Sequence, residues 1–199
     1  MRAEAMFLVS SYHRLLAGTR FCLRMAVAAA LCCGLAQAGS MRFESAGTYV
    51  SNDTYYLDAF ARVDLGMEPV QALINGVELH FLVQLAVFKT RRWWIDTPIL
   101  ERRLRYRLDY YELTQHFRVT DVQSGESENF RSVAAAVRKL GSLSRYALLP
   151  ANQINNRRRY VASIQLGLDL TRLPGPLMAQ ALRSDEWQLE TEEFQWSLN

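Results

Sequence analysis

Hydrophobic and polar residues alternate along three consecutive segments in the middle of the chain. In residues 77–87 every second residue is apolar, and in residues 100–111 leucine and tyrosine alternate with arginine and aspartate. The third segment covers residues 115–121. Alternation with a period of two is typical of half-buried β-strands, and the short turn between the second and third segments makes them antiparallel. The pattern therefore predicts three consecutive strands.

The same alternation recurs on both sides of this region. Residues 54–65 are expected to form a half-buried strand, and residues 160–170 a further one. Residues 187–198 close the chain with Phe194, Trp196 and Leu198 at alternate positions. Residues 39–53 are polar with scattered aromatic side chains, and we expect either a loose arm or a first edge strand.

Two segments have the spacing of short helices. Residues 68–74 begin with a proline in the first turn and are followed by Asn75 and Gly76, which can stop a helix in the left-handed conformation. In residues 131–140 the apolar positions recur at i, i+3, i+4 and i+7, and Gly141 follows as a C-cap. Residues 144–156 are expected to be a loop, and residues 177–182 a short strand or an extended link.

Long alternating strands in hairpin order, with helices only as connections, define the expected fold class. We expect a mainly β protein, with a single antiparallel β-sandwich or open barrel over residues 39–199 and one or two short connecting helices.

The first 38 residues have the three parts of an export signal. Arg20 and Arg24 supply positive charge, residues 25–35 are apolar, and residues 36–38 read Ala-Gln-Ala before the expected cleavage point. The apolar run has 11 residues, whereas a helix that spans a bilayer needs roughly 20. We therefore expect a cleaved signal peptide and a periplasmic protein; the alternative is an uncleaved signal that tethers the domain to the inner membrane.

Charge and cysteine content change once this segment is set aside. Four of the 23 basic residues and one of the 20 acidic residues lie in the first 38, so the remainder has equal numbers of each and no formal net charge. A neutral domain gives no electrostatic argument for nucleic-acid binding. All three cysteines lie in the same 38 residues, so the expected mature domain has no disulfide and relies on its core.

The densest aromatic and cationic cluster is the run Arg91, Arg92, Trp93 and Trp94. Adjacent residues of a strand point to opposite faces, so only one of the two tryptophans can enter the core. The other would be exposed, with an arginine stacked on its ring, as a contact surface for a ligand or a partner. This run is the first candidate binding site.

Arg103, Arg105 and Arg107 form the second candidate site, because alternate residues of one strand share a face. Three arginines in a row can bind carboxylates, phosphates or anionic lipid head groups through paired hydrogen bonds. The alternative is internal pairing across strands with acidic neighbours such as Asp58, Asp64 or Glu78.

Residues with the chemistry of catalysis or metal binding are few. After residue 38 the only histidines are His80 and His116, there is no cysteine, and neither a nucleophile elbow nor a phosphate-binding loop occurs. The carboxylates of Glu192 and Glu193 would point to opposite faces of a strand. We therefore expect neither an enzyme nor a metal site nor a cofactor.

Several short motifs occur together in the chain: Arg91-Arg92-Trp93-Trp94, Arg103-Leu104-Arg105-Tyr106, Val119-Thr120-Asp121, Ser124-Gly125-Glu126 and Phe194-Gln195-Trp196. With them the sequence, over roughly residues 42–198, resembles an exported proteobacterial family catalogued as domain of unknown function 4390. The resemblance brings no catalytic residues, and it implies a periplasmic or membrane-associated protein with a sensor-type partner at the inner membrane. The expected function is thus a non-enzymatic binding or accessory module for such a protein. The alternative is a carrier or sensor that holds a small amphiphilic ligand between its sheets.

Overall fold

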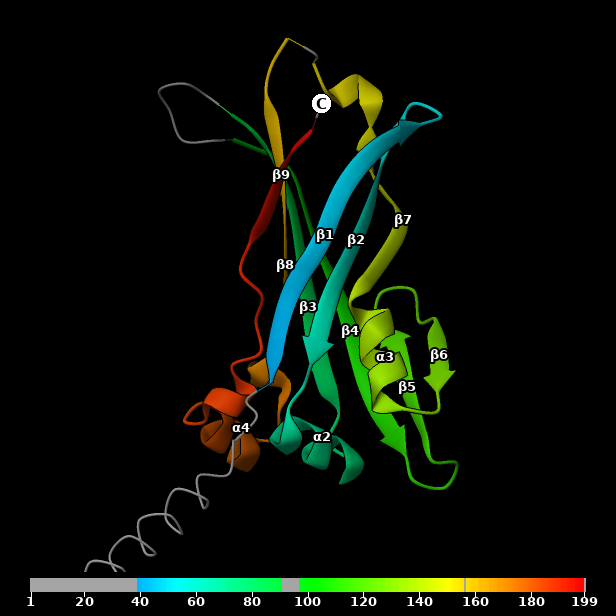
Figure 1. The fold of residues 1–199 in the computed structure, drawn as a ribbon, viewed down its shortest axis with the longest axis vertical. Helices are drawn as coiled ribbons and strands as arrows, with labels where there is room; N and C mark the ends of the chain where they lie inside the picture. Colours follow the sequence, from blue (N-terminus) through cyan, green and yellow to red (C-terminus); the bar gives the residue numbers. More distant parts are fainter. Residues whose placement is uncertain (1–38, 91–96, 156, 199) are drawn as a thin grey trace, which may run out of the picture. The chain divides into compact units, whose positions relative to one another are not determined.

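The strands of this protein form two antiparallel sheets (Figure 1). The computed structural model describes residues 39–90, 97–155 and 157–198. The smaller sheet, sheet A, has the order β1, β2, β7: β1 (Ser40–Ser51), β2 (Thr54–Asp64) and β7 (Ser142–Pro150). The larger one, sheet B, has the order β6, β5, β4, β3, β8, β9: β6 (Ser127–Phe130), β5 (His116–Asp121), β4 (Thr97–Tyr111), β3 (Leu79–Lys89), β8 (Tyr160–Leu168) and β9 (Phe194–Leu198).

The two sheets share one hydrophobic core. Alternate residues of β3 are buried, as the sequence pattern predicted, and they join buried residues of β2, β4 and β8 in a single cluster. At one side the edge strands of the two sheets meet, because Trp196 Nε1 donates a hydrogen bond to Thr48 Oγ1 at 3.3 Å and Phe43 packs on Phe194. The sandwich prediction is confirmed, and the described strands do not close into a barrel.

Three α-helices connect the strands of the described chain, one more than the upper expectation. They are α2 (Met67–Ile74), α3 (Val133–Leu140) and α4 (Gly175–Ala181), and short 3-10 turns lie at η1 (Ala151–Gln153), η2 (Leu170–Arg172) and η3 (Asp185–Trp187). The expectations for α2 and α3 are confirmed. For residues 177–182 the expected strand or extended link is wrong. Proline in the first turn is compatible with a helix, and α4 buries Ala181 against its neighbours.

Residues 144–156 were expected to be a loop, and this expectation is wrong for most of the segment. Residues 142–150 form β7, which pairs with β2. The period of two is lost here because the register shifts twice, Arg145 adopts a left-handed φ of 53°, and the adjacent Leu148 and Leu149 are both buried. The strand depends on its partner, and its own sequence pattern does not reveal it.

Residues 39–53 had two expected forms, and the edge strand is the observed one. β1 pairs with β2 from Ser40 to Ser51, with one bulge between Phe43 and Ser45, and ends in a tight turn at Asn52 and Asp53, with φ of 47° and 56°. Two consecutive left-handed residues are the geometry of the hairpin turn whose twist matches that of the strands. The short strand β6 was not predicted, because its residues are mostly exposed and do not alternate.

One end of the sandwich is closed by α2 and the segment that contains η2, α4 and η3, at the bottom of Figure 1. The indole of Trp187 is only 1% exposed, and its Nε1 donates a hydrogen bond to Glu68 Oε2 at 2.8 Å. Ser184 Oγ donates to the same oxygen at 3.2 Å. A buried tryptophan with its N–H paired therefore joins α2 to η3.

Gly141 lies at the junction of α3 and β7 and is needed for space. Its φ of −77° is ordinary for any residue, so the left-handed stop typical of a C-terminal glycine is absent. Its carbonyl accepts a hydrogen bond from Ala61 N at 2.7 Å. A Cβ at this position would overlap the carbonyl oxygen of Ala61, so glycine permits the close contact between α3 and β2.

Candidate functional site

The arginine stripe lies on the outer face of sheet B. Leu104 and Leu108 of β4 are buried in the core, so the alternate residues Arg103, Arg105 and Arg107 point outward. The predicted common face of these arginines is confirmed. Across the β3–β4 pair they lie opposite Gln84, Leu82 and His80 respectively.

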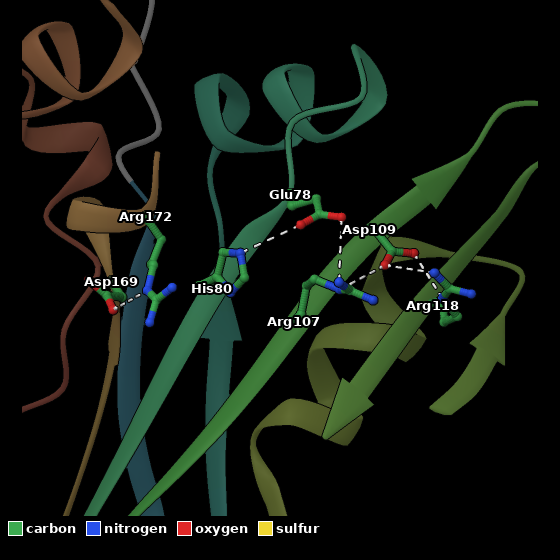
Figure 2. Close-up of polar contacts among 7 residues, drawn as sticks. All are labelled: Glu78, His80, Arg107, Asp109, Arg118, Asp169 and Arg172. Carbon is green, nitrogen blue, oxygen red and sulfur yellow. Dashed lines mark hydrogen bonds and ion pairs between the residues drawn. The ribbon is translucent and has the colours of Figure 1, made fainter. Parts of the chain in front are cut away.

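Arg107 forms ion pairs with two acidic residues of the same domain, Glu78 and Asp109 (Figure 2). Its Nη1 lies 3.7 Å from Glu78 Oε1, and its Nε lies 3.3 Å from Asp109 Oδ2. The second contact has ion-pair distance without the alignment of a hydrogen bond. Glu78 was one of the three acidic partners proposed from the sequence, and it is the one that pairs with the stripe.

Asp109 connects Arg107 to the neighbouring strand. Its side chain is only 10% exposed, and Arg118 of β5 donates to both of its oxygens, through Nε and Nη2, at 3.2 Å each. The guanidinium carbon of Arg118 also lies 4.2 Å from the ring centroid of Tyr111. A buried carboxylate between two arginines is stable because the charge is compensated and hydrogen-bonded. The pairing of Asp109 with Arg118 was not predicted from the sequence. The opposite charges of these residues, on consecutive antiparallel strands, are the signal that could have revealed it.

His80 extends the same cluster toward β8. Its Nε2 lies 3.6 Å from Glu78 Oε2, and its carbonyl accepts a hydrogen bond from Asp169 N at 2.7 Å. Partial burial lowers the pKa of His80 below its usual value, and the nearby Glu78 carboxylate opposes this shift. Arg172 lowers the pKa of His80 further and itself lies 3.9 Å from Asp169 Oδ2. Figure 2 shows these contacts at one end of the sheet.

Arg103 and Arg105 differ from Arg107. Both are exposed, and neither forms an ion pair with another residue in the part of the chain that the structure describes. The other two acidic residues expected as pairing partners form other contacts: Asp58 accepts a hydrogen bond from Arg145 N, and Asp64 accepts one from Gly66 N. The stripe is thus divided. Arg107 forms ion pairs within the domain, whereas Arg103 and Arg105 have open guanidinium groups, which are exposed and without an ion pair to a described residue.

A shallow groove of about 220 Å³ runs beside Arg103 on this face. It is lined by residues of β3 and β8, including Gln84, Ser163 and Gln165, and by the acidic residues Glu101 and Glu193. The groove therefore combines amide groups with charges of both signs. It can hold polar groups of a partner surface, in contact with one of the two open arginines.

The other candidate residues, Arg91, Arg92, Trp93 and Trp94, lie outside the described residues. The described chain brackets them with Lys89 and Thr97, which pair with each other across β3 and β4. Next to this pair, Thr90 N donates a hydrogen bond to the carbonyl of Arg159 at 3.0 Å, and residues 157–159 are exposed. The end of the hairpin is therefore joined to an arginine-rich turn.

Within the described residues, no three histidine, cysteine, aspartate or glutamate side chains come together as they would around a metal ion. In the same residues, none of the helices has both the length and the apolar character that crossing a bilayer requires.

Fold and site together define an antiparallel β-sandwich domain whose larger sheet has a charged outer face. The chain belongs to the family described as domain of unknown function (DUF4390), whose model matches residues 38–197. Neither the curated proteins nor the solved structures contain a match to this chain. The resemblance stated from the sequence motifs is therefore confirmed at the level of the family.

Proposed function

We propose that this chain is a non-enzymatic binding module, exported to the periplasm, that docks on an inner-membrane protein such as a sensor. The observation that carries the proposal is the division of the arginine stripe. Arg107 is neutralised by Glu78 and Asp109, whereas Arg103 and Arg105 stay exposed without an ion pair to another described residue. A domain without net charge that leaves two adjacent guanidinium groups open has a surface suited to an acidic partner.

The spacing of the two arginines specifies the partner's chemistry. Alternate residues of a strand lie about 7 Å apart along it, and each guanidinium can bind one carboxylate with two hydrogen bonds. The matching surface thus presents two carboxylates at about the same separation. The amide groups of Gln84 and Gln165 line the adjoining groove and can accept or donate further hydrogen bonds.

The packing of the core favours a partner module over a carrier of a small amphiphile. Buried side chains of both sheets form one continuous cluster, which includes Phe81, Leu57 and Ile164 at 1% exposure or less. A carrier needs apolar space for its ligand between the sheets. The side chains of this cluster occupy the region where such a ligand would lie.

The test is in-cell photocrosslinking of the full chain with a C-terminal tag. A photoreactive amino acid replaces Arg105 in one strain and Ser51 in a control strain, because Ser51 is exposed at the end of β1 on sheet A. We expect a single inner-membrane protein, identified by mass spectrometry, to be crosslinked from position 105 and not from position 51. Arg105→Glu is expected to abolish its co-purification and leave the melting temperature unchanged.

Three outcomes would contradict the proposal. Equal labelling from positions 105 and 51 would show that the contact is nonspecific. A lipid adduct without a protein adduct would assign the arginines to anionic head groups. A large fall in the melting temperature of Arg105→Glu would show that the arginine stabilises the fold.

A further inference from the structure

Sheet A has an open backbone edge that the ladder with β7 does not cover. The pairing of β2 with β7 begins at Thr54 with Pro150 and ends at Phe60 with Ser142. β2 itself continues to Asp64, still paired with β1. Among the described residues, no strand lies beside this last part of β2 on the side opposite β1, because the chain before Ser142 forms α3.

The backbone groups of this part of β2 have a defined direction. Ala61 N donates to the carbonyl of Gly141, so the hydrogen-bonding groups of Ala61 face the side away from β1. In a strand the N–H and C=O of alternate residues point to the same side. The register is continuous from Ala61 to Asp64, so the N–H and C=O of Val63 also face away from β1.

An apolar groove of about 500 Å³ adjoins this edge. Six consecutive residues of the chain line it, residues 60–65. Since side chains alternate between the faces of a strand, a groove lined by consecutive residues follows the edge of that strand. The opposite walls come from Val70 of α2 and from α3, which lies beside the lower part of β2 in Figure 1 and contributes Val133, Ala134 and Val137.

The charged residues at the groove indicate which charge an occupant should carry. Arg138 of α3 lines it, is exposed, and has no ion pair with another residue in the described ranges. Arg62, in contrast, is paired with Glu44. An occupant that carries one carboxylate near Arg138 would therefore match the groove in charge as well as in polarity.

We propose that this groove binds an extended peptide segment of the partner, which adds a strand to β2 in line with β7. The proposal rests on the proposed function as a partner module and specifies the chemistry of a second contact. The segment pairs its backbone with Val63, because the N–H of Ala61 is already bonded to Gly141. It places small apolar side chains against α3 and α2, and it carries an acidic residue for Arg138. Strand addition of this kind takes affinity from main-chain hydrogen bonds and specificity from alternate side chains.

The test uses a synthetic peptide as the probe. An acetylated hexapeptide of alternating valine and threonine that ends in glutamate is titrated into the purified, isotope-labelled full chain and followed by nuclear magnetic resonance. We expect the amide signal of Val63 to shift. N-methylation at one set of alternate peptide positions should weaken binding at least tenfold, and N-methylation at the other set should change it little, because only one set faces β2.

A blocking variant and its control complete the test. Ala134 is exposed and lines the groove, so Ala134→Trp should weaken peptide binding at least tenfold; Ala179→Trp, at an exposed position of α4, should not. Arg105→Glu should also leave peptide binding unchanged, since it lies on the outer face of sheet B. The peptide assay needs no partner, so its failure is distinguishable from failure of the crosslink at position 105.

The proposal is overturned if the peptide does not bind or if both sets of N-methylated peptides bind equally, which would mean that backbone pairing is absent. It is equally overturned if Ala134→Trp retains full binding. Saturable binding of a fatty acid at the same amides, without peptide binding, would assign the groove to an amphiphile instead.

Discussion

Arg118 and Asp109 face each other across β4 and β5, and both oxygens of the Asp109 carboxylate accept hydrogen bonds from the Arg118 guanidinium at 3.2 Å. Arg107 approaches the same carboxylate from its own strand. Asp109 is the one buried residue with an acidic or basic side chain among the described residues, tyrosines aside. Its position fixes two arginines on a face that is otherwise open to solvent.

Replacing Asp109 by alanine is expected to lower the free energy of unfolding by about 2 to 4 kcal/mol. The removal of one partner leaves the other charge uncompensated, and the partial exposure of Arg107 and Arg118 places the effect below that of a fully buried pair. Urea denaturation followed by circular dichroism measures this value. The matched control is Arg105→Ala, which should stay within about 0.5 kcal/mol of the parent; equal effects would disprove the internal role of Asp109.

Two glycines are expected to respond oppositely to alanine. Gly141→Ala forces a Cβ into the carbonyl of Ala61, so it should destabilise the domain by about 1 to 3 kcal/mol. Gly47 of β1 has open space where a Cβ would lie, so Gly47→Ala should be neutral or stabilising by up to about 1 kcal/mol. Melting temperatures of the two variants, measured side by side, check this. A tolerated Gly141→Ala would refute the close contact of α3 with β2.

Trp187→Phe is expected to lower the free energy of unfolding by about 2 kcal/mol. The substitution removes part of a fully buried ring and the donor to Glu68, and it leaves Ser184 Oγ as a donor to the same carboxylate oxygen. Glu68→Gln retains an acceptor oxygen, so it should cost less than the tryptophan change. If Trp187→Phe unfolds at the parent's denaturant midpoint, the proposed joint between α2 and η3 is wrong.

Acid is expected to destabilise the domain through His80. Its pKa is lowered in the folded state, so below pH 6.5 the unfolded chain binds a proton more readily than the folded one. The stability contributed by His80 is therefore present above pH 6.5 and is lost as the pH falls through the lowered folded-state pKa. The imidazole signals in a nuclear magnetic resonance titration report this value directly.

Glu78→Gln provides the companion measurement. Its carboxylate raises the pKa of His80 against the effect of burial, so the variant should titrate at a lower pH than the parent. A His80 pKa above 6.5 in the parent, or a rise in the variant, would contradict the assignment of these contacts.

Much of the fold could be predicted where each strand buries one face. The pattern of Phe81, Val83 and Leu85 belongs to a strand with neighbours on both sides, and the tertiary structure left it unchanged. β7 could not be predicted in this way, because Arg145 and the register shifts break its period. α4 was missed because the prolines at its start suggested an interruption rather than a first turn.

The face on which the candidate arginines lie could be predicted from the sequence, whereas their ion-pair partners could not. Period two was enough to place Arg103, Arg105 and Arg107 on one face. Which of them is neutralised depends on the β4–β5 register, which brings Arg118 against Asp109, and on the entry to β3, which brings Glu78 to Arg107. The spacing of residues within one strand predicts neither the register with the next strand nor the position of Glu78.

The order of strands in sheet B also governs how the domain can fold. β3 pairs with β4, the next strand along the chain, and on its other side with β8, where Phe81 lies opposite Leu168. β9, at the end of the described chain, then completes the sheet beside β8. Contacts between residues far apart in sequence slow the folding of β proteins. A nascent chain that lacks β8 and β9 can form the β3–β4 hairpin but leaves one edge of β3 unpaired, so this edge stays exposed until β8 has been synthesised.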